Sequence, residues 1–336
     1  MQMERYIGID FGGTNLRIAE VDPETGKIVD EPFSTNISEV YTNKELTDII
    51  RGRIPENANI GISAAGEVDE KNLVVRLSPN SKIEEEVIFG RDLKESGYDV
   101  TMTNDMKAAA QAVSKYGNGM HFDNVLVATY SSGYNCAVVR DGKNTTTAEF
   151  GHLVYKPDGD LFCGCGGKGH LEAYVSGNGA AAMAKNYFNI THRKDSEILR
   201  FAYDDEFGEI KLNDVLYEIS RDPELFRNVV NSIKAEHVYK AYNAKPEKEP
   251  QKSIKKTQVE AIAVSFGMMA SSYNPVDIMV LMGSQTKDWG VLFDPAIEKY
   301  NNNTLQLTSL KKPKITITNL PEIGVQGAVA YLLNNK

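Results

Sequence analysis

This 336-residue sequence has few cysteines, no long apolar segment and no excess of basic residues. Its three cysteines, two of them separated by a single residue, make a poor disulfide framework and favour a reducing compartment. No run approaches the ~18 apolar residues that a membrane-spanning helix requires, and the N-terminus carries no basic-then-apolar signal. A net charge of −9 argues against nucleic acid as a partner. We therefore expect a soluble, cytoplasmic protein that binds neither membranes nor nucleic acid.

The phosphate-binding pattern G-x-x-x-x-G-K-[ST] is also absent, which excludes the P-loop fold. The length exceeds what one hydrophobic core usually supports, and 41% of the residues are hydrophobic. Two domains are therefore the default expectation.

Two strand–glycine turn–strand units indicate a duplicated α/β architecture. Residues 6–10 and 15–21 are predicted as antiparallel strands around Gly12-Gly13, and residues 124–130 and 134–139 repeat this arrangement around Ser131-Ser132-Gly133. Further predicted strands are residues 58–63, 100–104, 277–282 (ending at Gly283) and 315–318, and predicted helical regions are 105–116, 173–272 and 323–333. The charged stretch 245–256 is predicted as a solvated loop or helix end.

A glycine-rich stretch over residues 149–172 concentrates thiols, imidazoles and carboxylates. Thiolate and imidazole ligands suit tetrahedral zinc, and the candidate ligands are His152, Cys163, Cys165 and His170. The flanking carboxylates of this stretch are left free to hold a small polyhydroxylated ligand. Its glycine spacing also fits a dinucleotide fingerprint, but no buried strand precedes it, so that match is discounted. A glycine loop with incidental cysteines remains the alternative.

The first glycine turn is a candidate phosphate site. Its sequence places the carboxylate of Asp10 at a strand end, where it would hold hydrated magnesium. Gly12, Gly13, Thr14 and Asn15 then offer backbone N–H groups and a hydroxyl to phosphate oxygens. An ordinary hairpin capped by aspartate is the alternative reading.

Asn104 and Asp105 occupy a predicted strand-to-helix junction, where an acidic residue usually caps the helix. In a chain that also carries a phosphate turn and a carboxylate-rich loop, Asp105 becomes the natural base for a hydroxyl proton in phosphoryl transfer.

Together these motifs resemble the ROK group of sugar kinases and sugar-responsive repressors, in the order typical of that group. The matching motifs are Asp10-Phe11-Gly12-Gly13-Thr14-Asn15, Ala65-Gly66-Glu67-Val68-Asp69, Ser78-Pro79-Asn80, Asn104-Asp105, Glu149-Phe150-Gly151-His152 and the cysteine loop ending in Leu171-Glu172. The resemblance implies the actin-like ATPase (ribonuclease H-like) fold, with sugar and ATP in a cleft between two α/β lobes. We expect a smaller lobe over residues 1–115 plus 320–336 and a larger lobe, with the zinc-type loop and the helical segment, over 116–319.

The resemblance also implies roles for individual residues. Asp105 would be the catalytic base, and His152 would turn one ring nitrogen to zinc and the other to the sugar. The implied sugar-binding residues are Gly66, Asn80, Asn104, Asp105, Glu149, His152 and Glu172. The implied nucleotide-binding residues are Asp10, Gly12, Gly13, Thr14, Asn15, Gly133 and Gly283. ATP, Mg²⁺ and a structural Zn²⁺ are the expected small partners, and the assembly implied is a homodimer.

Three positions depart from the family pattern. His170 replaces the usual third cysteine of the loop, which puts the geometry of the zinc site in doubt. The second glycine turn, Ser131-Ser132-Gly133, is poorer in glycine than is usual, so its hold on ATP is in doubt. The late ATP turn reads Gly283-Ser284 instead of a glycine pair.

The expected activity is transfer of the γ-phosphoryl of ATP to the 6-hydroxyl of a hexose or N-acetylhexosamine. Ala64-Ala65 puts small side chains near the expected pocket, which favours N-acetylmannosamine narrowly, with glucose next. One alternative is a sugar-responsive regulator of the same family, but the first hairpin begins by Gly8 and leaves no room for a preceding DNA-binding arm. A non-catalytic sugar-binding protein is the other alternative.

Overall fold

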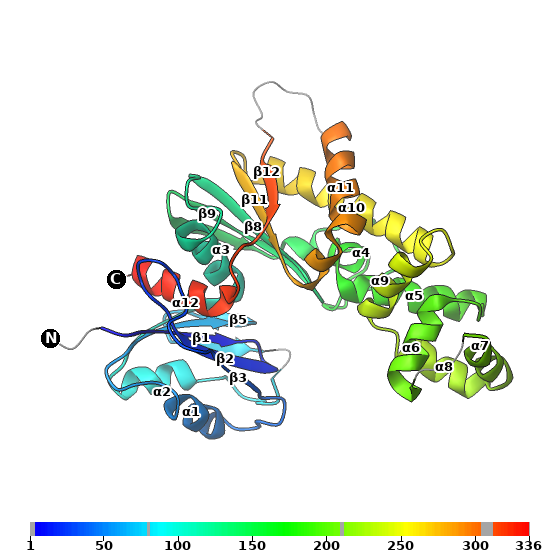
Figure 1. The fold of residues 1–336 in the computed structure, drawn as a ribbon. Coiled ribbons are helices and arrows are strands. Elements are labelled where there is room, and N and C mark those ends of the chain that lie inside the picture. Colours follow the sequence, from blue (N-terminus) through cyan, green and yellow to red (C-terminus); the bar gives the residue numbers. More distant parts are fainter. Residues whose placement is uncertain (1–3, 79–80, 209–211, 304–311, 336) are drawn as a thin grey trace.

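A computed structural model describes residues 4–78, 81–208, 212–303 and 312–335, which form two α/β lobes and a helical extension (Figure 1). The first lobe is built on a five-stranded sheet in the order β3–β2–β1–β4–β7. Strands β1, β2 and β3 are antiparallel, whereas β4 and β7 run parallel to β1. The strands are β1 (Tyr6–Phe11), β2 (Asn15–Glu20), β3 (Phe33–Asn36), β4 (Asn59–Ala64) and β7 (Asp99–Asn104).

The second lobe repeats this topology with strand order β10–β9–β8–β11–β12. An antiparallel β8–β9–β10 meander is again extended by two parallel strands. The strands are β8 (Asn124–Tyr130), β9 (Tyr134–Arg140), β10 (Lys143–Ala148), β11 (Ile278–Met282) and β12 (Lys314–Ile317). The two strand–glycine turn–strand units predicted from the sequence are therefore corresponding hairpins of two sheets with the same topology.

Two helices lie between the sheets and join the lobes (Figure 1). Helix α12 (Ile323–Asn334) packs on β1 and β4 of the first sheet, and α3 (Asp105–Tyr116) packs on β8 and β9 of the second. The helices also pack on each other, and a Cβ at Gly327 of α12 would lie 2.3 Å from the carbonyl oxygen of Ala108 in α3. Because only glycine permits so close an approach, the contact fixes how the two helices meet.

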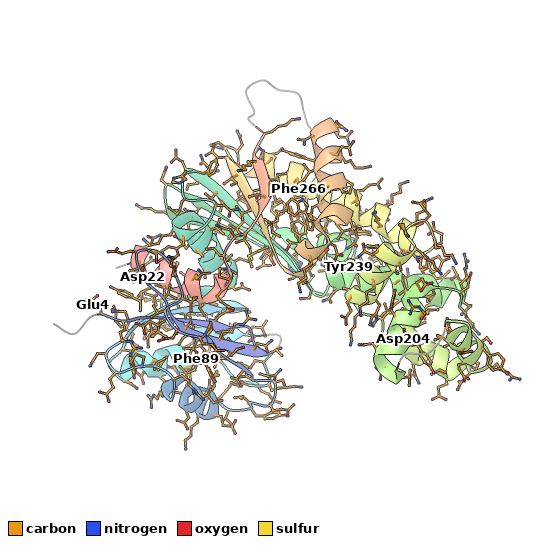
Figure 2. The ribbon with its side chains drawn as sticks, in the orientation of Figure 1. Glu4, Asp22, Phe89, Asp204, Tyr239 and Phe266 are labelled. Carbon is orange, nitrogen blue, oxygen red and sulfur yellow. The ribbon has the colours of Figure 1, made fainter. Side chains whose placement is uncertain are left out.

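Apolar cores on the outer side of each sheet support the lobes. Helices α1 (Asn43–Arg51) and α2 (Phe89–Glu95) cover the first sheet, and Phe89 of α2 is fully buried in the core (Figure 2). The second core includes Phe266 of the long helix α10 (Figure 2). The remaining helices are α4 (Glu172–Val175), α5 (Gly177–Thr191), α6 (Glu197–Phe207), α7 (Leu212–Arg221), α8 (Pro223–Asn231), α9 (Ala235–Ala244), α10 (Gln251–Ser272) and α11 (Trp289–Asn303). Among the described residues, no helix is both long and apolar enough to cross a membrane.

Short elements complete the chain. A small hairpin, β5 (Glu67–Asp69) and β6 (Val74–Leu77), follows β4, and two 3₁₀ turns, η1 (Phe150–His152) and η2 (Ser284–Asp288), follow β10 and β11.

Most predicted elements are confirmed to within one or two residues, and the helix predicted over 105–116 matches α3. The stretch 245–256, predicted as a solvated loop or helix end, comprises the loop after α9 and the first turns of α10, which begins at Gln251 directly after Pro250. Proline is tolerated at a helix start, where its missing N–H is not needed.

Candidate active site

The first glycine turn connects β1 to β2 and presents Asp10. The Gly12 N–H donates to the carbonyl of Asn15 at 2.9 Å, and Gly13 has a φ of 79°, so Gly12, Gly13, Thr14 and Asn15 form one tight turn. Asp10 accepts a 3.2 Å hydrogen bond from the Ser63 hydroxyl of β4. Burial raises the pKa of the Asp10 carboxyl, and the Ser63 hydrogen bond offsets part of that shift.

Asn104 ends β7 and Asp105 begins α3. Asn104 is the N-cap, since its Oδ1 accepts the N–H of Met106 at 3.0 Å. Its amide nitrogen donates to the Gly66 carbonyl at 3.4 Å, which ties α3 to the turn before β5. Asp105 Oδ1 also accepts the Met106 N–H, at 2.8 Å, so both side chains cap the start of α3.

Asp105 has the properties of a general base. Burial, followed by the charge of Asp10, raises the pKa of Asp105 to about 6. Glu149 adds a smaller upward contribution, so the charges of three elements, β1, α3 and the segment before η1, act on one another. A carboxylate with a pKa close to neutrality can accept a proton and release it again under physiological conditions.

Gly66 and Asn80 are two further residues that the resemblance assigns to the sugar. Gly66 has a φ of 114°, and a Cβ there would lie 2.1 Å from the Leu77 carbonyl oxygen, so this position requires glycine. Asn80 lies outside the described residues.

The cysteine loop brings four side chains together. The ligand atoms of His152, Cys163, Cys165 and His170 all lie within 4.8 Å of one another. Cys163 Sγ lies 3.4 Å from His152 Nδ1, and Cys165 Sγ lies 3.2 Å from His170 Nδ1. Two thiols and two imidazoles in this arrangement fit tetrahedral zinc, with His170 in the position of the family's usual cysteine.

The carboxylate of Glu172 connects this loop to the second glycine turn. Its Oε1 accepts from the Cys163 thiol at 3.1 Å, while Oε2 accepts the Tyr134 N–H at 3.1 Å. Burial and, to a smaller extent, this carboxylate raise the pKa of Cys163 to about 12, a shift that a bound cation would reverse. Glu172 also leaves little room for a side chain at position 133, because a Cβ on Gly133 would lie 3.0 Å from Oε2 of Glu172.

The two ring nitrogens of His152 have different neighbours. Its Nδ1 is directed to Cys163, and its Nε2 lies 3.6 Å from the carboxylate of Glu149, whose side chain is 76% exposed. Glu149 in turn acts on Asp105. Glu149 therefore connects the predicted base Asp105 with the predicted sugar-binding residue His152.

The second and third glycine turns adjoin a cavity. Gly283 follows β11 with a φ of 102°, and Gln285 donates to the carbonyls of Ser131 and Val175 at 3.0 and 3.1 Å. These contacts hold the turn after β8 against the turn after β11. The adjoining cavity has a volume of about 600 Å³, and its lining includes Ser132, Asn178, Tyr239, Lys240, Asn243 and Ser284.

Sequence reasoning missed several residues of this site. Ser63 was predicted only as part of a strand. Gly324 sits at the start of α12, where a Cβ would lie 2.3 Å from Asp10 Cγ. A glycine inside a helical pattern is a signal of close approach that could have drawn attention to it. The cavity residues of α9 recur every four positions along one helix face, a spacing typical of core packing as well.

Comparisons with known proteins agree with this geometry. The ROK family model matches residues 6–334. The glucokinase of Streptomyces coelicolor is 31% identical over 204 residues, which cover 57% of this chain and only 63% of that protein. The glucokinase of Thermotoga maritima is 27% identical over 311 residues, covering 88% of this chain and 86% of its own.

A solved structure has the same fold. The ROK family glucokinase of Streptomyces griseus, in complex with glucose and AMPPNP, superposes with a TM-score of 0.69 and 24% identity, covering 97% of this chain and 98% of its own. The predicted actin-like ATPase fold is thereby confirmed. With its family motifs found along the chain and a family match over nearly its whole length, this protein belongs to the ROK family.

Proposed function

We propose that this protein is an ATP-dependent kinase for the 6-hydroxyl of a hexose. The observation that carries the proposal is the position of Asp105, which starts α3 beside Asp10 and has a pKa raised to about 6. The names of the two glucokinase relatives support it.

In the proposed reaction, the 6-hydroxyl oxygen attacks the γ-phosphorus of ATP. The bond between that phosphorus and the β–γ bridging oxygen breaks, ADP leaves, and the hydroxyl proton passes to Asp105. Asp10 would hold Mg²⁺, which supplies charge neutralisation at the phosphates. Gly12, Gly13 and Thr14 would position the phosphates, so that catalysis comes mainly from alignment.

The nucleotide is proposed to extend from these phosphate turns past Gly133 and Gly283 into the cavity of about 600 Å³. That volume suits a small-molecule site. Backbone groups of the two turns would contact the ribose and phosphates, and α9 would flank the base.

Zinc is proposed to have a structural role in sugar binding. His152, Cys163, Cys165 and His170 would hold the ion, which fixes the ring of His152 through Nδ1. Nε2 of the same ring is then available to a sugar hydroxyl beside Glu149 and Glu172. Asn104 and Gly66, connected by a hydrogen bond, would bound the opposite side of the sugar.

Glucose is the sugar we propose first, ahead of N-acetylmannosamine. The reason for expecting an acetamido group was the small side chain pair Ala64-Ala65, of which Ala64 is fully buried in β4 and only Ala65 is partly exposed. The names of the relatives also favour glucose. A homodimer remains the proposed assembly.

The test is phosphorylation of five sugars side by side with ATP and Mg²⁺: glucose, mannose, glucosamine, N-acetylglucosamine and N-acetylmannosamine. We expect glucose to give the highest kcat/KM and the product to carry phosphate on oxygen 6. Asp105→Asn should lower kcat at least about 10²-fold while glucose still binds, as expected for loss of a general base. Asp48→Asn, which changes an exposed aspartate of α1, is the matched control.

The proposal fails if none of the five sugars is phosphorylated, or if Asp105→Asn keeps a near-normal kcat. Sugar binding without ATP turnover in the unaltered protein would instead identify a non-catalytic sugar-binding protein or regulator.

A further inference from the structure

The turn after β5 places a carboxylate beside the start of helix α3. This residue, Glu70, directly follows the family motif over residues 65–69 but is not part of it. Its side chain is 34% exposed, so most of it is covered by neighbouring elements. The proposed reaction uses Asp10 and Asp105 and leaves this third acidic residue without a role.

Glu70 accepts hydrogen bonds from three different elements of the fold. Its Oε1 accepts from the Thr103 hydroxyl of β7 at 2.7 Å and from the Lys107 ammonium group of α3 at 2.9 Å. Its Oε2 accepts from the Tyr331 hydroxyl of α12 at 3.0 Å. One carboxylate therefore ties β7 and α3 to α12, the other helix that joins the lobes.

Two of these partners lie on either side of Asp105 in the chain. Thr103 precedes Asp105 by two residues, and Lys107 follows it by two residues. Between them, the Asn104 amide donates to the carbonyl of Gly66 at the start of the same hairpin. The β5–β6 hairpin therefore holds the chain on both sides of Asp105.

The environment of Glu70 suits an anchoring role. Thr103 is fully buried, where its hydroxyl needs a hydrogen-bond partner, and Glu70 supplies one. Burial raises the pKa of the Glu70 carboxyl, but the hydrogen bonds from Thr103 and Lys107 outweigh burial and lower that pKa below its ordinary value. Glu70 is therefore ionised at neutral pH, and its oxygens can accept all of these hydrogen bonds.

We propose that Glu70 is a positioning residue for the general base Asp105. Its hydrogen bonds fix the point where β7 ends and α3 begins, and that point sets where the Asp105 carboxylate meets the sugar hydroxyl. A misplacement of about 1 Å can lower a rate about 10²-fold, so the anchor acts mainly on kcat. The inference rests on the proposed function, because Asp105 is a base only if the protein is a kinase.

The test compares Glu70→Ala with Glu70→Gln in the full-length protein, with glucose and MgATP as substrates. Glu70→Ala removes all the acceptors and should lower kcat about 10- to 100-fold, with KM for ATP changed less than about twofold. Glutamine keeps Oε1 for Thr103 and Lys107, so Glu70→Gln should retain kcat to within about threefold. Glu95→Ala, at an exposed glutamate that ends α2, is the matched control and should behave like the unaltered protein.

Thr103→Val tests the same anchor from the other side. Valine has nearly the size of threonine but cannot donate a hydrogen bond to Glu70, so kcat should fall about two- to tenfold. In the Glu70→Ala background the same substitution should have little further effect, because both changes remove the same hydrogen bond. This variant also decides the matter if Glu70→Ala does not fold.

A further measurement does not depend on activity. Backbone hydrogen exchange, followed by mass spectrometry without sugar or nucleotide, should be faster in Glu70→Ala over residues 99–110, because this segment loses its anchor. The Glu70→Gln and Glu95→Ala variants should exchange like the unaltered protein over the same residues.

Three results would overturn the proposal: a kcat in Glu70→Ala or Thr103→Val equal to that of the unaltered protein, an equal loss of kcat in Glu70→Gln and Glu70→Ala, or exchange that rises evenly along the whole chain. The last two would point to charge or to general stability as the cause. If the unaltered protein phosphorylates no sugar, the proposed function fails, and the exchange measurement alone decides whether Glu70 anchors the segment that carries Asp105.

Discussion

Two carboxylates far apart in the sequence, Asp10 and Asp105, act on each other in the candidate site. Asp105 could be picked out from the sequence because Asn104 precedes it at a helix start and a phosphate turn occurs in the same chain. Its raised pKa could not, since that shift arises from burial and from the charge of Asp10 across the sheet. The hydrogen bond from Ser63 to Asp10 could not be predicted either, because it depends on the pairing of β1 with β4.

The raised pKa of Asp105 predicts how activity depends on pH. The base must be ionised to accept a proton, so kcat/KM for glucose at saturating MgATP should fall as pH drops through about 6. The measurement is a pH profile of initial rates from acid to neutral pH. An acidic limb at the ordinary carboxyl pKa near 3.8 would contradict the assignment.

The same carboxylate should destabilise the folded protein at neutral pH. Because its folded pKa lies above the ordinary value of 3.8, folding binds a proton and becomes less favourable as pH rises from that value through about 6. Asp105→Asn removes this cost and should raise the free energy of unfolding by about 1–3 kcal/mol at pH 7.5. Denaturant unfolding should show the difference shrinking toward pH 4; a gain that does not depend on pH would exclude this cause.

The cysteine loop and helix α12 each take part in the candidate site through contacts with other elements of the fold. The gathering of the loop's four potential metal ligands was predictable because the cysteines and histidines lie close in the sequence. The link from Cys163 through Glu172 to Tyr134 was not, because it depends on how α4 packs against β9. Helix α1 was missed although Thr42 and Glu45 form a capping box, a signal that is readable in the sequence.

Loss of the zinc ion that we propose for the cysteine loop should weaken sugar binding selectively. Cys165→Ser should lower zinc content and raise KM for glucose about tenfold or more, with little change in KM for ATP, because His152 loses its orientation. Cys136→Ser, at a buried cysteine of β9, is the control and should keep the zinc. His170→Cys should keep the zinc, whereas His170→Ala should lose it. Unchanged zinc content in Cys165→Ser would exclude this residue as a ligand.

Helix α12 should tolerate no side chain at position 324. A Cβ at Gly324 would overlap the Asp10 carboxylate, so Gly324→Ala should destabilise the protein by about 1–3 kcal/mol and reduce kcat by displacing Asp10. Gly267→Ala in α10 is the matched control, since its Cβ would meet nothing closer than 4.0 Å, and it should be neutral or stabilise by up to about 1 kcal/mol. Equal stability and kcat in the two variants would refute the contact.

Across the whole molecule, a repeated sheet topology is joined through α3 and α12. The repeat was visible in the sequence as two strand–glycine turn–strand units, and the family motifs gave the fold. The packing of α3 on the second sheet was not visible, because the buried alanines of α3 fit any close helix contact. The outer strands β3 and β10 were also missed, since their short polar segments carry little apolar periodicity.

The most direct test of the central claim is a crystal structure of this protein with glucose and a non-hydrolysable ATP analogue. Our account predicts the sugar 6-hydroxyl within about 3 Å of the Asp105 carboxylate and directed at the γ-phosphate, with His152 Nε2 on another hydroxyl of the same sugar. A glucose molecule bound away from Asp105, or a nucleotide bound away from Asp10, would contradict it.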